Sequence, residues 1–150
     1  MQYIITLLIV FAGEFFWKDH IEKEVSENSS KKIWHDRIIL TKYHNYGAAL
    51  GTGKKRPKIV KYISVVITFV AVIFFICSFG LAGKGMMKSG FSLLLGGAFS
   101  NTYDRLKRGY VVDYFRLNVP VKRIRNIIFN VSDFCIILGT LLILLSDGME

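Results

Sequence analysis

Apolar and polar stretches alternate along this chain of 150 residues. Four apolar stretches occupy residues 3–17, 59–81, 86–103 and 127–145. A helix needs about 20 residues, within a range of about 17 to 25, to cross the hydrocarbon core of a bilayer. The second and fourth stretches meet this length, whereas the first and third are marginal and need support from neighbouring helices. We therefore expect an all-α membrane protein in which residues 1–150 form a single domain, a four-transmembrane-helix bundle.

Two polar inserts separate these stretches. The longer one, residues 18–58, begins with a charged segment that is helical or irregular. It continues with Arg37–His44, whose β-branched and aromatic residues are typical of strands, so we expect a small sheet on the membrane surface. The shorter insert, residues 107–126, connects the third and fourth stretches. In the third stretch, Gly96-Gly97 is a pair of small residues of the kind that allows close helix packing.

Composition favours a membrane protein and argues against nucleic-acid binding. Hydrophobic residues make up 52% of the chain, and the formal net charge is +9. The Lys and Arg residues lie in the polar gaps without a nucleic-acid-binding motif, so attraction to anionic lipid headgroups explains them more simply. Cys77 and Cys135 lie within apolar stretches, and the three histidines are scattered. This pattern predicts neither a disulfide nor a metal site, and we expect no cofactor.

Two aspartates stand where a charge is costly. Asp113 ends the apolar run 109–113, and Asp133 lies about one turn inside the fourth apolar stretch. An ionisable side chain within or beside a membrane span is a functional-site hypothesis by default. If the third and fourth stretches run antiparallel, both aspartates belong to the same membrane face. Two carboxyl groups held close in a partly dry site share one proton, so the ionised member activates water and the neutral member protonates a departing amine.

The same aspartates allow a simpler explanation. An aspartate at a membrane surface is usually a helix cap or an ion-pair partner, and three arginines are available nearby: Arg105, Arg108 and Arg116. Polar groups also need partners wherever water is excluded, which favours a working site at this end of the bundle. Further polar residues gather at the same ends of the third and fourth stretches: Asn101, Asp104 and Asn130.

Four short motifs follow one another along the chain: Asn45–Leu50, Gly96–Arg105, Gly109–Asp113 and Phe129–Asp133. In this order they resemble the lipoprotein signal peptidases (signal peptidase II), and the resemblance covers most of the chain. It implies an intramembrane aspartic endopeptidase that cleaves the signal peptide of diacylglyceryl-modified bacterial prolipoproteins before the lipobox cysteine. It also implies a bundle of four membrane helices with a small extracytoplasmic β-cradle.

The resemblance assigns roles by position. Asp113 and Asp133 correspond to the catalytic dyad, and no metal takes part. Six further residues correspond to positions that hold the substrate and shape the site: Asn45, Gly47, Asn101, Asp104, Arg105 and Asn130. The implied partners are lipidated prolipoprotein substrates and membrane lipids. We expect a monomer that binds no nucleic acid.

Several positions depart from the family pattern. The Asp-Gln pair near the end of the first span is Glu14-Phe15 here, although Lys18 is retained. None of the changes removes the proposed chemistry, and together they indicate a divergent member. The other departures replace Phe, Gly and Ala of the family pattern by Leu50, Ser100 and Ser132.

Charge and resemblance disagree about which side of the membrane the aspartates face. Apart from Lys84 and Lys88, all Lys and Arg residues lie in or beside the two inserts, and the positive-inside rule would make that side cytoplasmic. The family has its active site outside, where exported prolipoproteins are found. We follow the family and expect a multi-pass protein of the bacterial inner (cell) membrane with its active site on the extracytoplasmic face.

Two other functions are compatible with the sequence. A non-catalytic paralogue would bind lipidated peptides, or confer resistance to a signal-peptidase inhibitor, without cutting. The retention of Asp113 and Asp133 argues against it. A small transporter or channel subunit would use the aspartates to carry protons or cations, but charges confined to the membrane surface make a translocation path hard to build. Cleavage of a lipidated prolipoprotein separates the peptidase from both alternatives.

Overall fold

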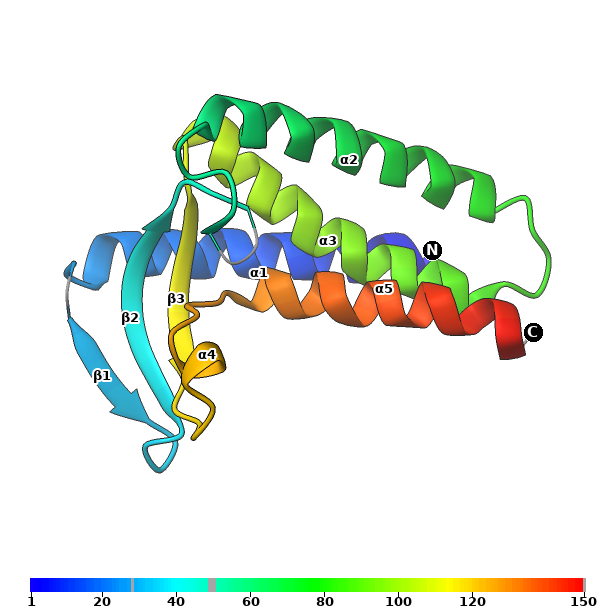
Figure 1. Cartoon of the computed structure of the whole chain (residues 1–150). Coiled ribbons are helices and arrows are strands. Elements are labelled where there is room, and N and C mark those ends of the chain that lie inside the picture. Colours follow the sequence, from blue (N-terminus) through cyan, green and yellow to red (C-terminus); the bar gives the residue numbers. More distant parts are fainter. Residues whose placement is uncertain (28, 49–50, 150) are drawn as a thin grey trace.

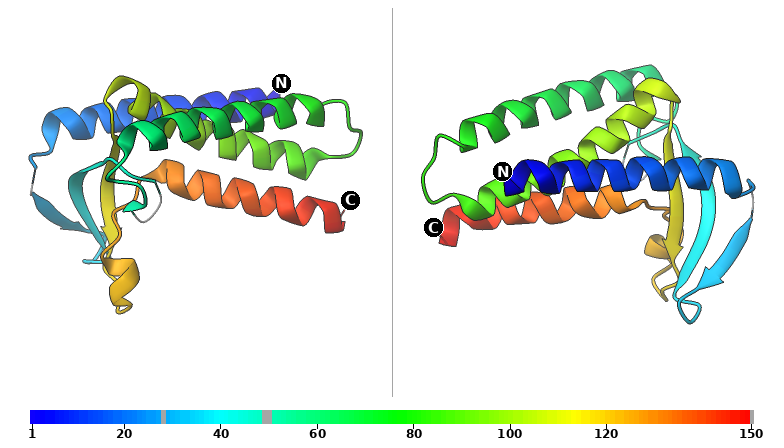
Figure 2. Two further views of the ribbon diagram at one scale, coloured as in Figure 1. Left: turned by 45° about the horizontal axis from the view of Figure 1, so that its top comes forward. Right: turned by 180° about the vertical axis from the view of Figure 1, so that it is seen from behind.

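In the computed structural model, which describes residues 1–27, 29–48 and 51–149, four long helices lie along one another and a small sheet lies across one end of them (Figure 1). The long helices are α1 (Gln2–Glu24), α2 (Pro57–Ser78), α3 (Gly85–Lys107) and α5 (Val131–Met149). The sheet consists of β1 (Ser30–Ile33), β2 (Ile38–Asn45) and β3 (Val111–Leu117), and α4 (Lys122–Arg125) is a single turn. The start of α1 and the end of α5 both lie away from the sheet (Figure 2).

The four long helices follow the four predicted apolar stretches in order. Two of them are longer than predicted, because α1 continues past Trp17 to Glu24 and α3 continues past Tyr103 to Lys107. Charged residues are tolerated in these extra turns because several of them pair with one another between the helices. Pro57 opens α2 in its first turn, where the missing N–H has no helical partner to lose.

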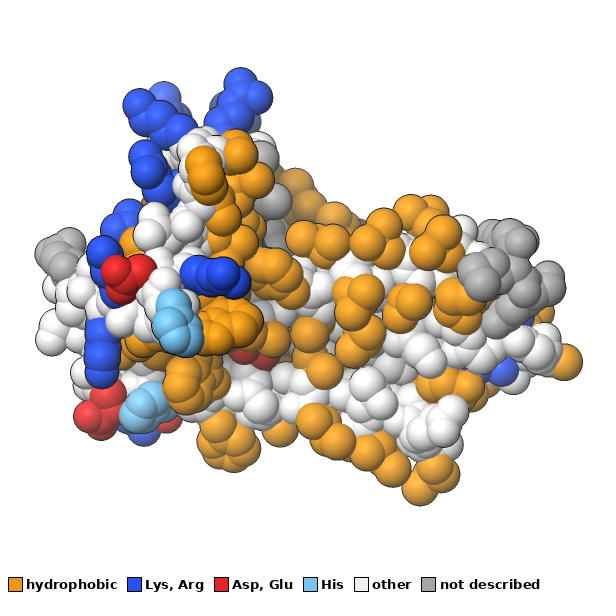
Figure 3. All heavy atoms as spheres, turned by 90° about the horizontal axis from the view of Figure 1, so that it is seen from below, with side chains coloured by type: hydrophobic (Ala, Val, Ile, Leu, Met, Phe, Trp, Pro, Cys, Tyr) orange, Lys and Arg blue, Asp and Glu red, His pale blue; other side chains and the backbone are white. Residues whose placement is uncertain are grey.

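The helix α2 has the clearest membrane character. Within the described part of the chain, it alone is both long and apolar enough to cross a bilayer, and 131–146 of α5 is a shorter apolar segment. Val66, Phe69 and Ile76 on α2 are more than half exposed. Apolar surface of this kind is expected where lipid, not water, surrounds a helix. Figure 3 shows hydrophobic side chains spread over the helices, whereas Lys and Arg side chains gather over the sheet end.

The three strands form one antiparallel sheet in the order β1-β2-β3. The predicted strand in residues 37–44 is confirmed, since β2 spans Ile38–Asn45. The strand β3 is a correction, because the second insert was expected only to connect two helices. The chain is therefore mainly helical with a three-stranded sheet, rather than strictly all-α. The residues that suit β3 to a strand are β-branched or aromatic: Val111, Val112, Tyr114 and Phe115.

A tight turn joins α3 to β3 and so sets the position of Asp113. Gly109 has a φ of 85°, a left-handed conformation that glycine adopts without steric cost. The strand begins two residues later, at Val111, which pairs with Asn45 at the end of β2. Further along the same ladder, Asp113 pairs with Tyr43. The strand register therefore brings the end of β2 beside the first half of β3.

Glycines allow α3 to pack closely against two neighbouring helices. A Cβ atom added at Gly96 would lie 2.7 Å from a side chain of α1, and one at Gly97 would lie 2.5 Å from the carbonyl oxygen of Ser132 on α5. The predicted packing role of Gly96-Gly97 is thereby confirmed. Gly90 of α3 and Gly139 of α5 face each other in the same way, because a Cβ at Gly139 would lie 2.5 Å from the carbonyl oxygen of Gly90.

We expect Gly139→Ala to destabilise the bundle by about 1–3 kcal/mol, since the added methyl group has to displace backbone atoms of α3. Gly13→Ala in α1 is the matched control, because nothing lies within 4 Å of its added Cβ and alanine favours a helix. Thermal unfolding of both variants in detergent measures the difference. An unchanged melting temperature for Gly139→Ala would contradict the close crossing of α3 and α5.

Candidate active site

Strand β3 and the first turn of α5 bring Asp113 and Asp133 to one cleft at the sheet end of the bundle. The cavity has a volume of about 660 Å³ and lies between α2, α3, α5 and the sheet. The sequence expectation that the two aspartates lie together therefore agrees with the structure. Three of the other predicted site residues line the same cavity: Asn45, Asn101 and Arg105.

Asp113 is buried and held by two asparagines. The side-chain amide of Asn45 donates to its Oδ2 over 2.9 Å, and that of Asn130 donates to its Oδ1 over 2.7 Å. Burial, followed by the nearby charge of Asp133, raises the pKa of Asp113 to about 7, despite these hydrogen bonds. A carboxyl group with this pKa retains its proton in much of the neutral range, so it can act as an acid.

Asp133 is also held by two asparagines, and it shares Asn130 with Asp113. The side-chain amide of Asn101 donates to its Oδ1 over 3.1 Å, and the backbone N–H of Asn130 donates to its Oδ2 over 3.1 Å. The Oδ1 atom of Asn130 accepts the backbone N–H of Asp133 over 3.0 Å. Asn130 is fully buried and contacts both carboxyl groups, so it fixes one aspartate relative to the other.

The orientation of Asn101 is fixed by a buried lysine. Lys18 reaches from α1 and donates to the Oδ1 of Asn101 over 2.7 Å. Because an ammonium group can only donate, the oxygen of this amide has to face Lys18 and its NH₂ group has to face Asp133. Lys18 therefore acts on Asp133 through Asn101. The lysine also donates to the Oγ of Ser100 over 3.0 Å.

Asp104 does not line the cleft. It is buried, lies 3.2 Å from the ammonium of Lys18, and accepts the backbone N–H of Val112 over 3.2 Å. The last contact ties α3 to β3 one residue before Asp113. Its position indicates that Asp104 orients the strand, whereas the resemblance suggested a direct part in holding the substrate.

Arg105 lines the cleft and links α3 to the loop after β2. Its guanidinium donates to the carbonyl oxygen of Gly47 over 2.9 Å and to that of Asn101 over 3.2 Å. The backbone approaches Gly47 closely, since an added Cβ would lie 2.7 Å from the carbonyl oxygen of Thr52. Ala49 and Leu50, which complete this motif and include one departure from the family pattern, lie outside the described residues.

The alternative explanation of the aspartates as ion-pair partners is not supported. Among the residues that the structure describes, neither Asp113 nor Asp133 forms an ion pair with an arginine. Arg108 instead pairs with Asp19 and Asp104, each over 3.5 Å. In the same part of the chain, no group of three His, Cys, Asp or Glu side chains is arranged to hold a metal ion.

Sequence reasoning noted Glu14 and Lys18 as motif positions but did not place them in the site. A Glu and a Lys four residues apart in an otherwise apolar helix are a signal of a buried pair, which the structure shows with 3.7 Å between their charged atoms. Ser132 was noted only as a departure from the family pattern, and Tyr114 was missed. Periodicity does not mark Tyr114 as a site residue, because it follows Asp113 in the strand and faces the opposite way.

We expect Lys18→Met to destabilise the protein by about 3–5 kcal/mol, because it removes the cation beside the buried Glu14 and leaves the buried Asp104 with Arg108 alone, at 3.5 Å. Lys23→Met is the matched control in the same helix. Lys23 pairs with Asp19 over 2.7 Å but is 69% exposed, so its loss should change stability by less than about 1 kcal/mol. Chemical denaturation in detergent compares the two, and equal effects would contradict the role of Lys18.

Comparison with known proteins identifies the family. The sequence model of the family described as signal peptidase (SPase) II matches residues 6–147. The lipoprotein signal peptidases of Halothermothrix orenii and Brevibacillus brevis are each 32% identical to this chain, over 97% and 100% of it and 93% and 97% of their own lengths. A bacterial membrane enzyme solved by the in meso method superposes with a TM-score of 0.82 at 26% identity, over 99% of this chain and 90% of its own. A second such structure gives a TM-score of 0.80 at 25% identity. This chain therefore belongs to the signal peptidase II family, which makes it a membrane-associated protease.

Proposed function

We propose that this protein is an aspartic endopeptidase, which cleaves the signal peptide of diacylglyceryl-modified bacterial prolipoproteins before the lipobox cysteine. The observation that carries the aspartic mechanism is the pair Asp113 and Asp133, joined through Asn130 at one cleft. Curated relatives named lipoprotein signal peptidase support the substrate class.

The two carboxyl groups have different surroundings, which supports different roles. Asp113 has a pKa raised to about 7 and is the member that keeps the shared proton at neutral pH. Asp133 lies in the first turn of α5, where the helix dipole favours negative charge. In the proposed reaction, Asp133 takes a proton from the attacking water, and Asp113 gives its proton to the departing amine. The peptide bond is broken by water alone, without a covalent intermediate.

The remaining cleft residues are proposed to hold the substrate backbone. Asn45 and Arg105 present polar groups beside Asp113, and the guanidinium of Arg105 has its Nε buried without a hydrogen-bond partner among the described residues. A buried donor of this kind favours a substrate carbonyl oxygen as its partner. Gly47 keeps the loop backbone close to this position. We assign Asp104 a positioning role instead, because it lies behind β3.

The other half of the cleft is apolar and supports a lipidated or membrane-embedded substrate. This half is lined by four apolar residues of the long helices: Ile67 of α2, Leu94 of α3, and Ile136 and Ile137 of α5. An apolar signal-peptide segment or an acyl chain gains free energy when it leaves water for such a surface. When it leaves lipid instead, the gain depends on close packing. We propose that this half holds the apolar part of the substrate while the polar half holds the scissile bond.

We further propose that all four long helices span the membrane. The length of α1 and α3, 23 residues each, is sufficient for a crossing, and the buried charged residues within them, Glu14, Lys18 and Asp104, pair with one another. The sheet and its Lys and Arg residues then lie at one membrane surface, where anionic headgroups attract them. That the protein is a monomer and binds no nucleic acid remains a prediction.

The aspartates are proposed to face the extracytoplasmic side of the bacterial inner membrane. In this orientation both ends of the chain lie in the cytoplasm, because they are at the end of the bundle away from the sheet. We expect a phosphatase reporter fused after Glu150, a residue outside the described part of the chain, to be inactive, and a fluorescent protein at the same place to be bright. An active phosphatase would reverse the orientation, as would a dark fluorescent protein that is present in full-length form.

We expect Asp113→Asn and Asp133→Asn each to abolish cleavage of a diacylglyceryl-modified prolipoprotein, because an amide can neither take the proton from water nor supply one to the leaving amine. Asp36→Asn is the matched control, since Asp36 is 64% exposed in the turn between β1 and β2. Cleavage is followed by gel mobility with purified protein, and unfolding curves verify that each variant is folded. Retained cleavage by either dyad variant would remove that residue from the dyad.

The same assay addresses the non-catalytic alternative. A paralogue that only binds lipidated peptides would retain the substrate without producing a shortened product, for the wild-type chain as well. The retention of both carboxyl groups, each held by two hydrogen bonds at one cleft, favours the peptidase over this alternative. An unlipidated precursor in a parallel lane tests whether the diacylglyceryl group is required.

A further inference from the structure

The start of α5 is held by side chains from two other elements. The backbone N–H of Val131 donates to the hydroxyl of Tyr114 over 3.1 Å, and that of Ser132 donates to the Oε2 of Glu14 over 3.0 Å. The next N–H, that of Asp133, donates to the Oδ1 of Asn130. The first N–H groups of a helix have no partner within the helix and need one from outside it. Here β3 and α1 supply two of these partners.

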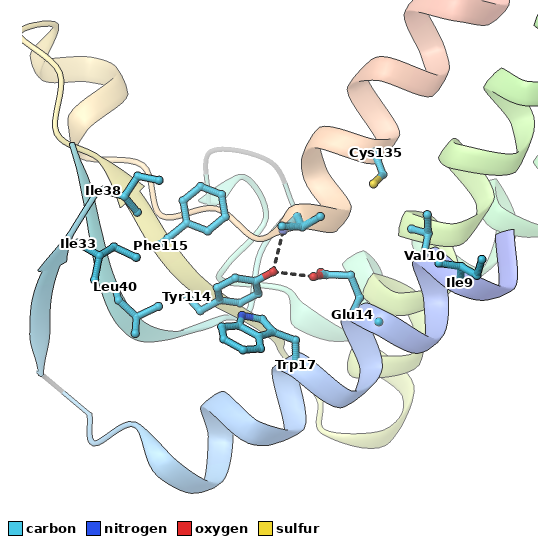
Figure 4. Close-up of a pocket in the computed structure, with 12 residues that line it drawn as sticks. Ile9, Val10, Glu14, Trp17, Ile33, Ile38, Leu40, Tyr114, Phe115 and Cys135 are labelled. Carbon is cyan, nitrogen blue, oxygen red and sulfur yellow. Dashed lines mark hydrogen bonds between the residues drawn. The ribbon is translucent and has the colours of Figure 1, made fainter. Parts of the chain in front are cut away.

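These side chains also bind one another. The hydroxyl of Tyr114 donates to the Oε1 of Glu14 over 2.5 Å, and the hydroxyl of Ser132 donates to its Oε2 over 2.7 Å. All three side chains are buried, with exposed fractions of 4% or less. Figure 4 shows the hydroxyl of Tyr114 directed at both Glu14 and the start of α5, in a pocket with mostly apolar walls. We call these three residues, Glu14, Tyr114 and Ser132, the Glu14 cluster.

The Glu14 cluster lies directly behind the two aspartates. Tyr114 follows Asp113 in β3, and neighbouring side chains of a strand point to opposite faces. Ser132 precedes Asp133 in the first turn of α5. The cluster therefore joins the residue beside one aspartate to the residue beside the other. None of its members lines the substrate cleft.

We propose that the Glu14 cluster sets the separation between Asp113 and Asp133, so that its members are positioning residues for the peptidase reaction. This inference rests on the proposed function. Asn130 joins the two aspartates on the cleft side of β3, and the cluster joins their neighbours on the opposite side. Glu14 and Ser132 are also two of the positions at which this chain departs from the family pattern, and they are in direct contact. The hydroxyl of Ser132 and the carboxylate of Glu14 form a matched pair in this chain.

A role in setting this separation differs measurably from a general contribution to stability. If α5 starts farther from β3, the charge of Asp133 acts less strongly on Asp113, and the pKa of Asp113 falls from about 7 toward its ordinary value. Three cations also lie near Asp113, namely Lys18 on α1, Arg105 on α3 and Lys54, which lines a second pocket with Asp113. The substitution Tyr114→Phe alters none of these three side chains. Cleavage requires one proton on the pair, so the loss of activity on the alkaline side should move to lower pH.

The test compares Tyr114→Phe with Tyr110→Phe. Both substitutions remove one hydroxyl that donates to a glutamate of α1, since Tyr110 donates to the Oε1 of Glu22 over 2.6 Å. Only Tyr114 also touches α5. We expect Tyr114→Phe to lower kcat about tenfold to a hundredfold, as a displacement of reacting groups by a fraction of an ångström to 1 Å does. KM should change by less than about twofold, because the cluster makes no contact with the cleft. Tyr110→Phe should leave kcat and its pH profile unchanged.

The outcomes are distinguishable in a single experiment. A lower kcat with an alkaline limb shifted to lower pH supports the inference, whereas a wild-type kcat and pH profile in folded Tyr114→Phe overturns it. A lower kcat with an unshifted limb also overturns it, since the separation of the aspartates would then be unchanged. Absence of cleavage by the wild-type chain overturns the proposed function and this inference with it. If Tyr114→Phe does not fold, Ser132→Ala decides by the same criteria, because it removes one hydroxyl and leaves the backbone bond to Glu14 intact.

Discussion

The buried ammonium of Lys18 is the interaction on which the rest of this structure depends. It lies between the carboxylates of Glu14 and Asp104 and binds Asn101. Each contact leads to a different part of the candidate active site: Asp104 holds β3, Glu14 holds α5, and Asn101 holds Asp133. Removing a lysine of this kind from water costs several kcal/mol, and the cost is offset only when both charge and hydrogen bonds are satisfied. The arrangement is therefore sensitive to every one of its members.

Burial explains why so many polar contacts converge here. Backbone groups at a helix end or a strand start have to find partners within the protein when they are buried away from water. The start of α5 and the start of β3 both meet this condition through side chains: Glu14 and Tyr114 serve the helix, and Asp104 serves the strand at Val112. The two carboxyl groups that we propose to be catalytic lie one residue from these anchored backbone groups. The contacts that anchor the backbone therefore also orient the two carboxyl groups.

Much of this organisation could be predicted from the sequence, and the exceptions have physical reasons. Hydrophobic stretches located the four long helices, and the cost of an isolated charge identified Asp113 and Asp133. Strand β3 was missed because it is a short apolar run that follows α3 closely. Such a run has no periodicity that distinguishes a strand from the end of a helix. The contacts of Lys18 with Ser100 and Asn101 span more than 80 residues of sequence and depend on how α1 and α3 are rotated about their axes. A single sequence carries little information about that rotation.

The two carboxyl groups differ because one belongs to a strand and the other to the start of a helix. Asp113 lies on a buried strand, beside neutral amide donors and the like charge of Asp133. Burial, followed by this repulsion, therefore raises its pKa. Asp133 lies at the positive end of a helix dipole and is linked through one amide to the cation of Lys18. A chemically symmetric pair would have to choose its acid and its base when the substrate arrives. In the proposed mechanism, the secondary structure assigns these roles beforehand, and the contacts behind β3 keep the two environments at a fixed separation.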